Sequence, residues 1–302
     1  MSGRAFTTRR LPAFMRTGRG ACGMVLLVAV LVIALFGPFF TSNDPAAIVG
    51  APGTGPGPGH PLGLDYLGRD VLTRVLWGGR SVIWLSLAAT ALCFVIGLAI
   101  GLIAGYVGGI VDPILMRTVD VVLCFPPLLF FLLVATSVGT SELTLIAGVA
   151  IVLSPGMARI VYSATKETAT RGYVEAAVLR GESTSSILRR EIFPNILPPV
   201  IANLGLLVTF SILLIAAVNF LGIGIQPPAA NWALMISENR PIISINVWAT
   251  LVPALMLATL TIGVNLVGDA VSHTLGRTER IAEAVASPTG PGAPTYSPTE
   301  VA

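Results

Sequence analysis

Residues 21–40 read ACGMVLLVAVLVIALFGPFF. This run contains no charged residue, which indicates that it folds in a lipid bilayer and not in water. A helix rises ~1.5 Å per residue, so about 20 apolar residues cross the ~30 Å hydrocarbon core of a bilayer. The whole chain has the same character, because 54% of its 302 residues are hydrophobic and only 11% are charged. Soluble domains carry charge on roughly a quarter of their residues. We therefore predict an all-α polytopic membrane protein.

The segment before this run, residues 1–20, contains five arginines and no acidic residue. A cleaved signal peptide is the alternative interpretation, but its apolar core would span about 7–15 residues and end at a small-x-small site. The present run is longer and closes on Phe39 and Phe40. We predict an uncleaved first transmembrane helix over 21–40, preceded by a basic cytoplasmic N-terminus over 1–20.

Residues 41–80 are predicted to form an extracytoplasmic loop. Their first part is rich in proline and glycine, as in GPGPG at 55–59, which favours irregular structure. From Leu64 to Arg80 apolar residues recur with helical spacing beside charged ones, and Asp70 and Arg74 stand at i,i+4. This pattern predicts a short amphipathic helix at the outer membrane interface.

The core of the chain, residues 81–275, is predicted to hold five further spans and one long cytoplasmic loop over 158–199. The spans are expected at 81–104, 114–138, 143–161, 197–221 and 247–267. Six spans place both termini on one side of the membrane. Residues 276–302 are expected to be a disordered cytoplasmic tail, since their end is rich in Ser, Pro, Thr and Gly.

The distribution of basic residues supports this threading. Most of them fall on segments predicted to be cytoplasmic: the N-terminal arginines, then Arg159, Lys166, Arg171, Arg180, Arg189, Arg190, Arg277 and Arg280. The predicted external segments contain only Arg69, Arg74, Arg80 and Arg240. This asymmetry is the one expected from the positive-inside rule.

The sequence lacks the residues that several kinds of functional site require. The three cysteines are isolated in apolar runs, and the only histidines, His60 and His273, have no partners at metal-ligand spacing, so no metal is expected. The single lysine, Lys166, is not part of a phosphate-binding loop, and no nucleophile elbow is present. The basic residues form no patch with interleaved aromatics, which argues against nucleic acid. We expect a non-catalytic protein without a cofactor of its own.

The long loop carries the most informative motif. Tyr173-Val174-Glu175-Ala176-Ala177 is followed by Gly181 and then by Ile192-Phe193-Pro194-Asn195. Paired alanines let a helix approach a partner closely, and glycine permits backbone conformations that a side chain obstructs. A solvated hairpin is the plain alternative. The motif resembles the signature of ABC-importer permeases, which implies that Tyr173, Glu175, Ala176, Ala177, Gly181 and Pro194 couple this chain to separate ATPase subunits.

A second resemblance covers most of the chain, from Ala21 to about Leu275. HPLGLDYLGRDVL at 60–72, AGYVGG at 104–109 and QPP at 226–228 look like the C-type subunit of dipeptide and oligopeptide permeases. The resemblance implies the type I ABC-importer permease fold and a bacterial inner-membrane location with both termini cytoplasmic. It also implies a homologous B-type permease subunit, two ATPase subunits that bind ATP, and an extracytoplasmic substrate-binding protein. Candidates for contacting that protein are Asp65, Arg69, Asp70, Gln226 and Trp232.

Other residues stand out within the predicted spans. Gly97, Gly101 and Gly105 lie four apart, which favours close helix packing, with a flexing hinge as the alternative. Arg117 and Asp120 stand at i,i+3, and we interpret them as a neutralising pair, although intramembrane charges also suggest function. Asn203, Asn219 and Asn265 are weaker candidates for interhelical hydrogen bonds or for lining a path.

The functional prediction is a permease subunit that moves di- or oligopeptides inward across a lipid bilayer. Related subunits serve nickel chelates, glutathione or haem, and the residues do not separate these cargoes. A self-sufficient secondary transporter or channel is the alternative from another class, and it would need buried carboxylates near mid-membrane. Only Asp120 comes near that description.

Overall fold

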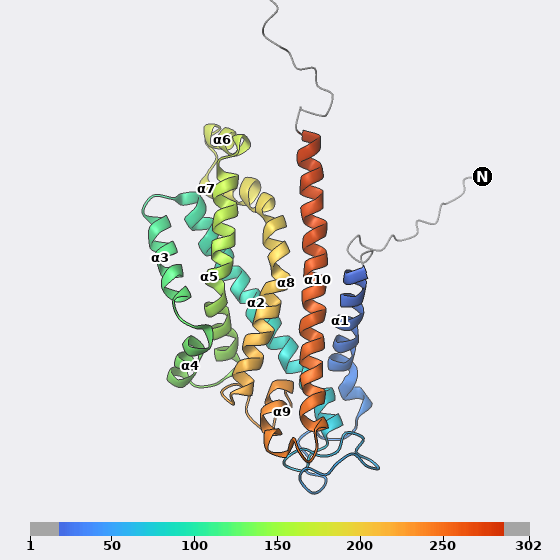
Figure 1. Cartoon of the computed structure of the whole chain (residues 1–302). Coiled ribbons are helices and arrows are strands. Elements are labelled where there is room, and N and C mark those ends of the chain that lie inside the picture. The colour runs from blue at the N-terminus through green and yellow to red at the C-terminus, as the bar shows by residue number, and fades with distance from the viewer. Residues whose placement is uncertain (1–17, 287–302) are drawn as a thin grey trace, which may run out of the picture.

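The computed structural model describes residues 18–286, and its side chains to residue 274. Its longest helices lie side by side in an elongated bundle (Figure 1). They are α1 (Gly18–Phe36), continued by the short η2 (Gly37–Phe40), α2 (Val71–Val107), α5 (Glu142–Ala169), α8 (Phe193–Phe220) and α10 (Trp248–Ala286). The shorter elements are α3 (Val111–Leu123), α4 (Pro127–Val138), α6 (Gly172–Leu179), α7 (Thr184–Ile187), η3 (Leu188–Ile192), α9 (Trp232–Glu238) and η4 (Arg240–Ile242).

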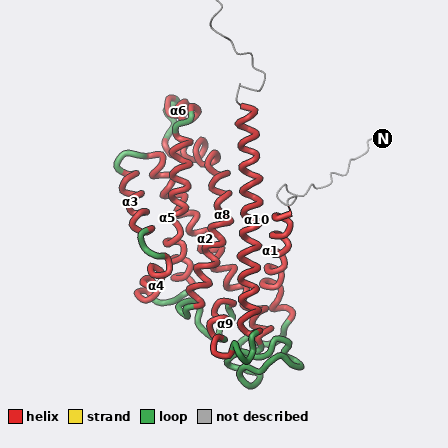
Figure 2. The backbone as a smooth tube through the Cα atoms, in the orientation of Figure 1, coloured by secondary structure: helices red, strands yellow, loops and turns green. Residues whose placement is uncertain are grey.

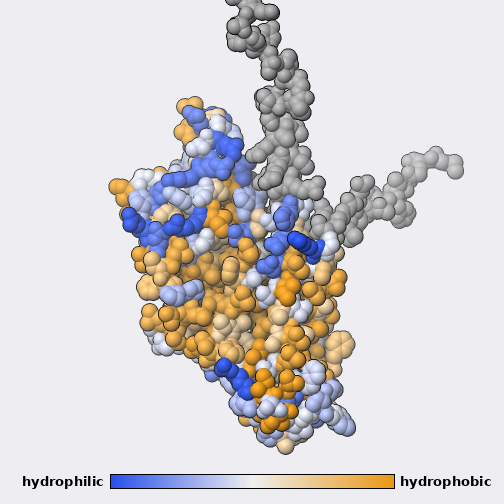
Figure 3. All heavy atoms as spheres, in the orientation of Figure 1, coloured by the Kyte–Doolittle hydropathy of each residue, from blue (hydrophilic) through white to orange (hydrophobic). Residues whose placement is uncertain are grey.

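The bundle has two distinct ends. One end carries α6 together with the start of α1 and the end of α10, and the other carries α9 and the loop before α2 (Figure 1). The loops lie mainly at these two ends (Figure 2). Hydrophobic residues cover the surface between them, and hydrophilic residues gather toward the α6 end (Figure 3). Within the described residues, five helices are long and apolar enough to cross a membrane, or six spans if the bent pair α3–α4 counts as one.

The predicted span at 114–138 is interrupted. It is built from α3 and α4, which meet at a bend of 91°. The break falls at Cys124–Pro126, where Pro126 has an extended ψ of 128° and Pro127 occupies the first turn of α4. Each proline removes a backbone donor and disfavours helical geometry in the residue before it, so the pair favours a break in the helix here.

The amphipathic helix expected over residues 64–80 is not a separate element. Residues 64–70 form turns and isolated bridges, and a single helix of 37 residues then runs from Val71 through the predicted span. Asp70 begins this helix, because its carboxylate accepts a hydrogen bond from the Thr73 amide at 2.8 Å. The predicted helical periodicity is therefore correct for 71–80, but the separation from the span is wrong.

The tail prediction is wrong over residues 276–286, which continue α10 as helix. This stretch, GRTERIAEAVA, is rich in alanine, glutamate and arginine, all good helix formers. The rest of the predicted tail and most of the basic N-terminus lie outside the described residues.

Small residues let the helices approach closely. A Cβ atom added at Gly97, Gly101 or Gly105 of α2 would lie 2.6–2.7 Å from atoms of α5. Gly205 of α8 and Gly268 of α10 face each other in the same way, with a Cβ on Gly205 only 2.5 Å from the Cα of Gly268. In a lipid environment such contacts replace the hydrophobic effect as the main source of helix association.

Candidate functional sites at the two ends of the bundle

Helix α6 stands at one end of the bundle and divides into two faces. Val174 and Ala177 are fully buried and belong to a hydrophobic cluster with residues of α5 and the start of α8. Tyr173, Glu175 and Ala176 are exposed on the other side. The buried pair attaches α6 to the bundle.

Apolar side chains also project from α6. Val178 is 52% exposed and Leu179 is 82% exposed. Together with Tyr173, at 42% exposed, they give an eight-residue helix an apolar outer surface beside charged groups. Exposed apolar side chains of this kind mark a surface that contacts another protein more often than one that stays in water.

Gly181 ends α6 in a turn that requires its residue type. Its φ is +73°, a left-handed conformation that other residues rarely adopt. The amide of Gly181 donates to the Val178 carbonyl at 2.9 Å, and the amide of Glu182 donates to that of Ala177 at 3.2 Å. A Cβ on Gly181 would meet no atom within 4 Å. The requirement is therefore conformational, and the turn redirects the chain sharply into α7.

Glu182 reinforces this turn. Its carboxylate accepts hydrogen bonds from Arg180 at 2.7 Å and from the Ser186 hydroxyl at 3.0 Å. The guanidinium of Arg180 and then the hydroxyl of Ser186 lower the pKa of Glu182 below its ordinary value. Pro194, the last of the predicted coupling residues, is exposed near the start of α8, within the continuous helical segment Thr184–Phe220 and directly after the π-helical turn η3.

Ion pairs between helices surround the same end. Asp120 of α3 pairs with Arg159 of α5, and Asp112 pairs with Lys166 at 2.9 Å. The predicted pairing of Asp120 with Arg117 is wrong, because α5 lies beside α3 and offers a closer cation. Arg117 is exposed. Sequence spacing can reveal only the partner on the same helix.

The three asparagines have different surroundings. Asn219 is buried at the end of α8, where its amide donates to the Ile215 carbonyl at 2.8 Å and its oxygen accepts from the Ile225 amide at 2.7 Å. It stabilises the turn after α8 and joins no other helix. Asn203 and Asn265 are half-buried, and among the described residues their side chains have no hydrogen-bond partner.

A buried cluster of four charged side chains lies at the opposite end. Asp65 and Arg74 are 0% exposed, Arg69 is 2% exposed and Glu238 is 6% exposed. Arg69 donates to Asp65 at 2.6 Å and to Glu238 at 3.0 Å. Arg74 donates to Glu238 at 2.9 Å and lies 3.6 Å from Asp65. We call these four residues the buried charge cluster.

The local sequence builds this cluster in a defined way. The second carboxylate oxygen of Asp65 accepts from the amides of Leu67 and Arg69 at 2.9 and 2.8 Å, which closes a tight turn before α2. Asn239 then accepts from the Tyr66 amide at 2.9 Å, and Asn246 donates to the Leu62 carbonyl at 2.9 Å. The loop before α2 is thus held to the segment around α9, over 160 residues away in the chain.

Asp70 does not pair with Arg74 as predicted. It accepts from Thr73 at the start of α2 and lies 2.9 Å from His60, whereas Arg74 turns toward Glu238. The helix places Arg74 one turn into α2, against α9, where Glu238 is the better partner. Glu238 is not identified from the sequence, because it lies 164 positions from Arg74.

Some polar atoms of the cluster have no hydrogen-bond partner. These are Nε and Nη1 of Arg74 and Oε1 of Glu238, all buried. Burial raises the pKa of Glu238 above its ordinary value, and the positive charges of Arg74 and Arg69 oppose that rise only partly. Burial likewise raises the pKa of Tyr66.

Four of the five predicted contacts for a binding protein are wrong as surface positions. Asp65, Arg69 and Trp232 are fully buried and Asp70 is 7% exposed, so no other protein can reach them in this structure. Trp232 packs against Gly78 and Gly79, and its ring nitrogen donates to the Val75 carbonyl at 2.8 Å. Only Gln226 is exposed, and its amide donates to the carbonyls of Gly222 and Gly224. From the sequence alone, Asp65, Arg69 and Asp70 are predicted to lie on the surface because the sequence does not show which side chains pair with them.

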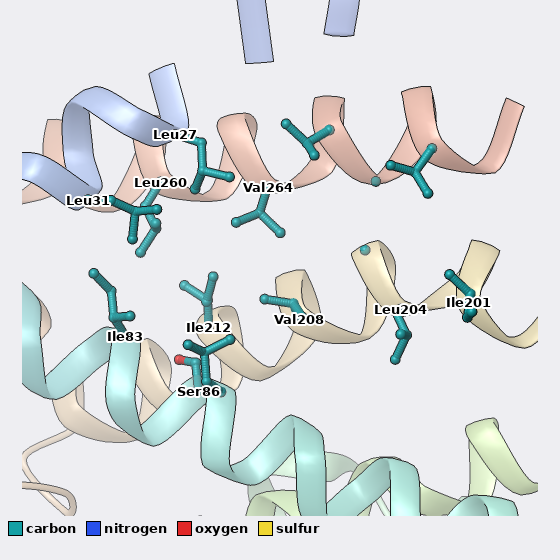
Figure 4. A pocket seen from close by; sticks show the side chains of 15 residues that line it. Leu27, Leu31, Ile83, Ser86, Ile201, Leu204, Val208, Ile212, Leu260 and Val264 are labelled. Carbon is teal, nitrogen blue, oxygen red and sulfur yellow. The ribbon is translucent and has the colours of Figure 1, made fainter. Parts of the chain in front are cut away.

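A cavity of about 360 Å³ lies between α1, α2, α8 and α10. Side chains including Leu27, Val208 and Val264 converge on it (Figure 4). Its one hydroxyl, on Ser86, donates to the Val82 carbonyl at 2.7 Å and is not free to bind a ligand. A polar solute would leave its own hydrogen-bonding groups unpaired there. Within the described residues no group of His, Cys, Asp and Glu side chains could hold a metal ion.

Comparison with known proteins places this geometry in context. Residues 97–277 match the family model described as binding-protein-dependent transport system inner membrane component. The chain is 33% identical to the dipeptide transport system permease protein DppC of Bacillus subtilis, over 84% of this chain and 80% of that protein. It is 30% identical to DppC of Haemophilus influenzae, over 87% and 92% respectively. A chain of the MetNI methionine ABC transporter has the same fold, with a TM-score of 0.55 at 19% identity, over 68% of this chain and 96% of that one.

Proposed function

The chain belongs to the binding-protein-dependent transport system inner membrane components, and from this premise we propose that it forms half of the path of an ABC importer for di- and oligopeptides. The peptide cargo is supported by relatives named for dipeptide transport at 30–33% identity over most of the chain. The alternatives of nickel chelates, glutathione or haem have no comparable support. The chain is a multi-pass inner-membrane protein.

The observation that carries the proposal is the form of α6. A short helix bearing Glu175, Ala176 and Ala177 stands at the end of the bundle, with one face exposed and the other packed against α5, α7 and η3. We assign the exposed face to an ATPase subunit. ATP-driven closure of the two ATPases would then move α6 as a lever, and Val174 and Ala177 would pass that movement to the membrane helices.

This assignment also orients the chain. If α6 contacts an ATPase, the α6 end is cytoplasmic, and both the start of α1 and the end of α10 lie on that side (Figure 1). The excess of basic residues on these segments agrees with the positive-inside rule. The α9 end then faces outward, toward a substrate-binding protein.

The path itself is assigned to the boundary between this chain and a homologous B-type permease subunit. The cavity inside the bundle is apolar and cannot pair the backbone groups of a peptide. The bundle therefore offers one wall of a path. ATP is bound by the partner subunits, and this chain contributes no catalytic group, cofactor or metal.

Two charge reversals test the proposal. We expect Glu175→Lys to lower both ATPase association and peptide uptake severalfold, because an exposed charge at the centre of a contact is inverted. Glu142→Lys, an equally exposed reversal at the start of α5, is the control and should leave both unchanged. Retention of ATPase binding and uptake by Glu175→Lys would place the contact elsewhere.

Reconstitution tests the wider claim. Vesicles that contain this chain alone should show no peptide uptake with or without an ion gradient. Uptake should appear only with the second permease, the ATPases, the binding protein and ATP. Gradient-driven uptake by the chain alone would instead identify a secondary transporter.

A further inference from the structure

A second groove lies beside α6 and has a different composition from the cavity inside the bundle. It has a volume of about 520 Å³ and runs between the end of α2 and the segment from α7 to the start of α8. One wall is formed by Leu102, Ile103 and Val107, and Phe193 lies on the other side. Ile103 and Val107 are 43% and 49% exposed. The groove thus presents accessible apolar walls.

The other part of the groove is polar, and its side chains form no hydrogen bonds or ion pairs with described residues. It is lined by Arg189 and by the hydroxyl residues Thr184 and Ser185, all exposed. Within the described part of the chain, neither the guanidinium nor the two hydroxyls have a hydrogen-bond or ion-pair partner. By contrast, Arg159, Lys166, Arg171 and Arg180 at the same end are each paired with a carboxylate.

The position of the groove indicates which kind of ligand it can bind. The apolar wall belongs to the last two turns of α2, where one candidate span ends at Val107, and the polar wall opens the span that begins at Thr184. Both helices are longer than the ~20 residues that cross the hydrocarbon, so the groove at their α6-side ends lies toward the membrane–water interface. A ligand that fits needs an anionic group with several acceptor oxygens and a hydrocarbon chain attached to it.

We propose that this groove binds one anionic phospholipid. The phosphodiester accepts hydrogen bonds from Arg189 and from the hydroxyls of Thr184 and Ser185, while an acyl chain lies along Leu102, Ile103 and Val107. Basic pockets between membrane helices on the cytoplasmic side are suited to such headgroups. The nearest carboxylates do not oppose it, because Glu182 is bound to Arg180 and Ser186 and Glu191 does not line the groove.

The site adjoins the turn that joins α6 to α7. A lipid held by Thr184, Ser185 and Arg189 stabilises the chain directly after Gly181 and Glu182. The proposal concerns binding, so it stands even if α6 contacts no ATPase. If α6 does make that contact, bilayers with anionic lipid should strengthen the coupling of ATP hydrolysis to uptake.

Adjacent arginines provide a matched test. Arg189 and Arg190 are both exposed and without an ion pair among the described residues, but only Arg189 lines the groove. The full chain, purified with its associated subunits, is placed in nanodiscs of phosphatidylcholine containing increasing phosphatidylglycerol, and retained phosphatidylglycerol is counted by native mass spectrometry. Arg189→Gln should weaken retention about fivefold, the effect of one basic residue near a membrane surface. Arg190→Gln should not change it.

Two further arms separate other occupants. Inorganic phosphate at millimolar concentration should not displace the lipid, because it lacks a chain for the apolar wall, and Ile103→Trp should reduce retention without a change in charge. Equal losses in both arginine variants would indicate diffuse charge attraction. Displacement by phosphate would indicate a free-anion site, and retention of phosphatidylglycerol only after the ATPases have been stripped from the complex would show that protein covers the groove. Each of these three results overturns the proposal.

Discussion

At the α9 end of the bundle a cluster of charged side chains is buried, whereas the ion pairs at the α6 end are exposed. Asp65, Arg69, Arg74 and Glu238 are at most 6% exposed, and the carboxylates of Asp65 and Glu238 are shared between the two arginines. At the other end Arg171 and Glu167 are 54% and 73% exposed, and each is paired with the other alone. Both ends hold charge on a helical scaffold, but they hold it in opposite surroundings.

The difference indicates how each end responds to force. A buried charge has only its neighbouring side chains to replace water, so the cluster tolerates few arrangements and fixes the loop before α2 against α9. Exposed pairs are worth little and can break and re-form in water. Under the proposed function, a rigid α9 end and an adjustable α6 end suit a protein that receives its movement through α6.

The largest effect is expected from Glu238→Ala. This change leaves Arg69 and Arg74 buried without their shared carboxylate, and breaking a buried pair in this way typically costs about 3–5 kcal/mol. The free energy of unfolding in mixed micelles should fall by that amount. Glu182→Ala, which removes a partly exposed carboxylate at the α6 end, serves as the comparison and should have a much smaller effect. Equal stability of the two variants would contradict the contrast between the ends.

The buried charge cluster also marks a limit of sequence analysis. Asp65, Arg69 and Arg74 can be recognised as a charged group, and the helical spacing of residues 71–80 is visible in the sequence. Their partner cannot be found there, because Glu238 is separated from Arg74 by 164 positions and only the fold brings the two together. From the sequence alone, these charges are therefore predicted to lie on a surface. The structure contradicts this prediction, because all four side chains of the buried charge cluster are buried.

Gly101→Leu is expected to have the next largest effect. The new Cβ would lie 2.6 Å from the Ala158 carbonyl oxygen and from the Cβ of Val161, so α2 and α5 would have to separate. Overpacking of this kind costs about 1–3 kcal/mol. Gly156→Leu on α5 is the matched control, since its Cβ would meet no atom within 4 Å. The two variants should differ in thermal stability in the same detergent, and equal melting temperatures would show that the close approach is not required.

The spans themselves are more accessible to prediction than their ends. Hydropathy detects the part of a helix that lies in hydrocarbon, so the predicted spans lie near the observed positions of α1, α8 and α10. It does not detect helix that continues into water, as α5 does to Ala169 and α10 does to Ala286. It also cannot distinguish a straight span from the pair α3–α4, for which the prolines at 126 and 127 are the usable signal.

A smaller effect is expected from Gly181→Ala. At a φ of +73° an L-residue is disfavoured by roughly 1–2 kcal/mol, although the space for its methyl group is open. The turn between α6 and α7 should loosen, which lowers the stimulation of ATPase activity by substrate more than it lowers overall stability. Gly172→Ala, at the start of α6 with no contact within 4 Å and no positive φ, provides the control. Similar coupling in both variants would show that the turn geometry is not needed.

The smallest effect is expected from Lys166→Met, which removes the ion pair with Asp112. Lys166 is 51% exposed and Asp112 is 17% exposed, so water and salt compete with the interaction. The free energy of unfolding should change little, and the difference from wild type should shrink further as salt is raised. Arg74→Met makes a similar replacement at the α9 end, where both partners are buried, and its cost should be larger and nearly independent of salt. The salt dependence is a sharper measure than the change in unfolding free energy itself, because it reports whether water and ions reach each charge. If both variants respond to salt alike, the buried charge cluster is accessible to water, and the mechanical distinction between a rigid α9 end and an adjustable α6 end fails.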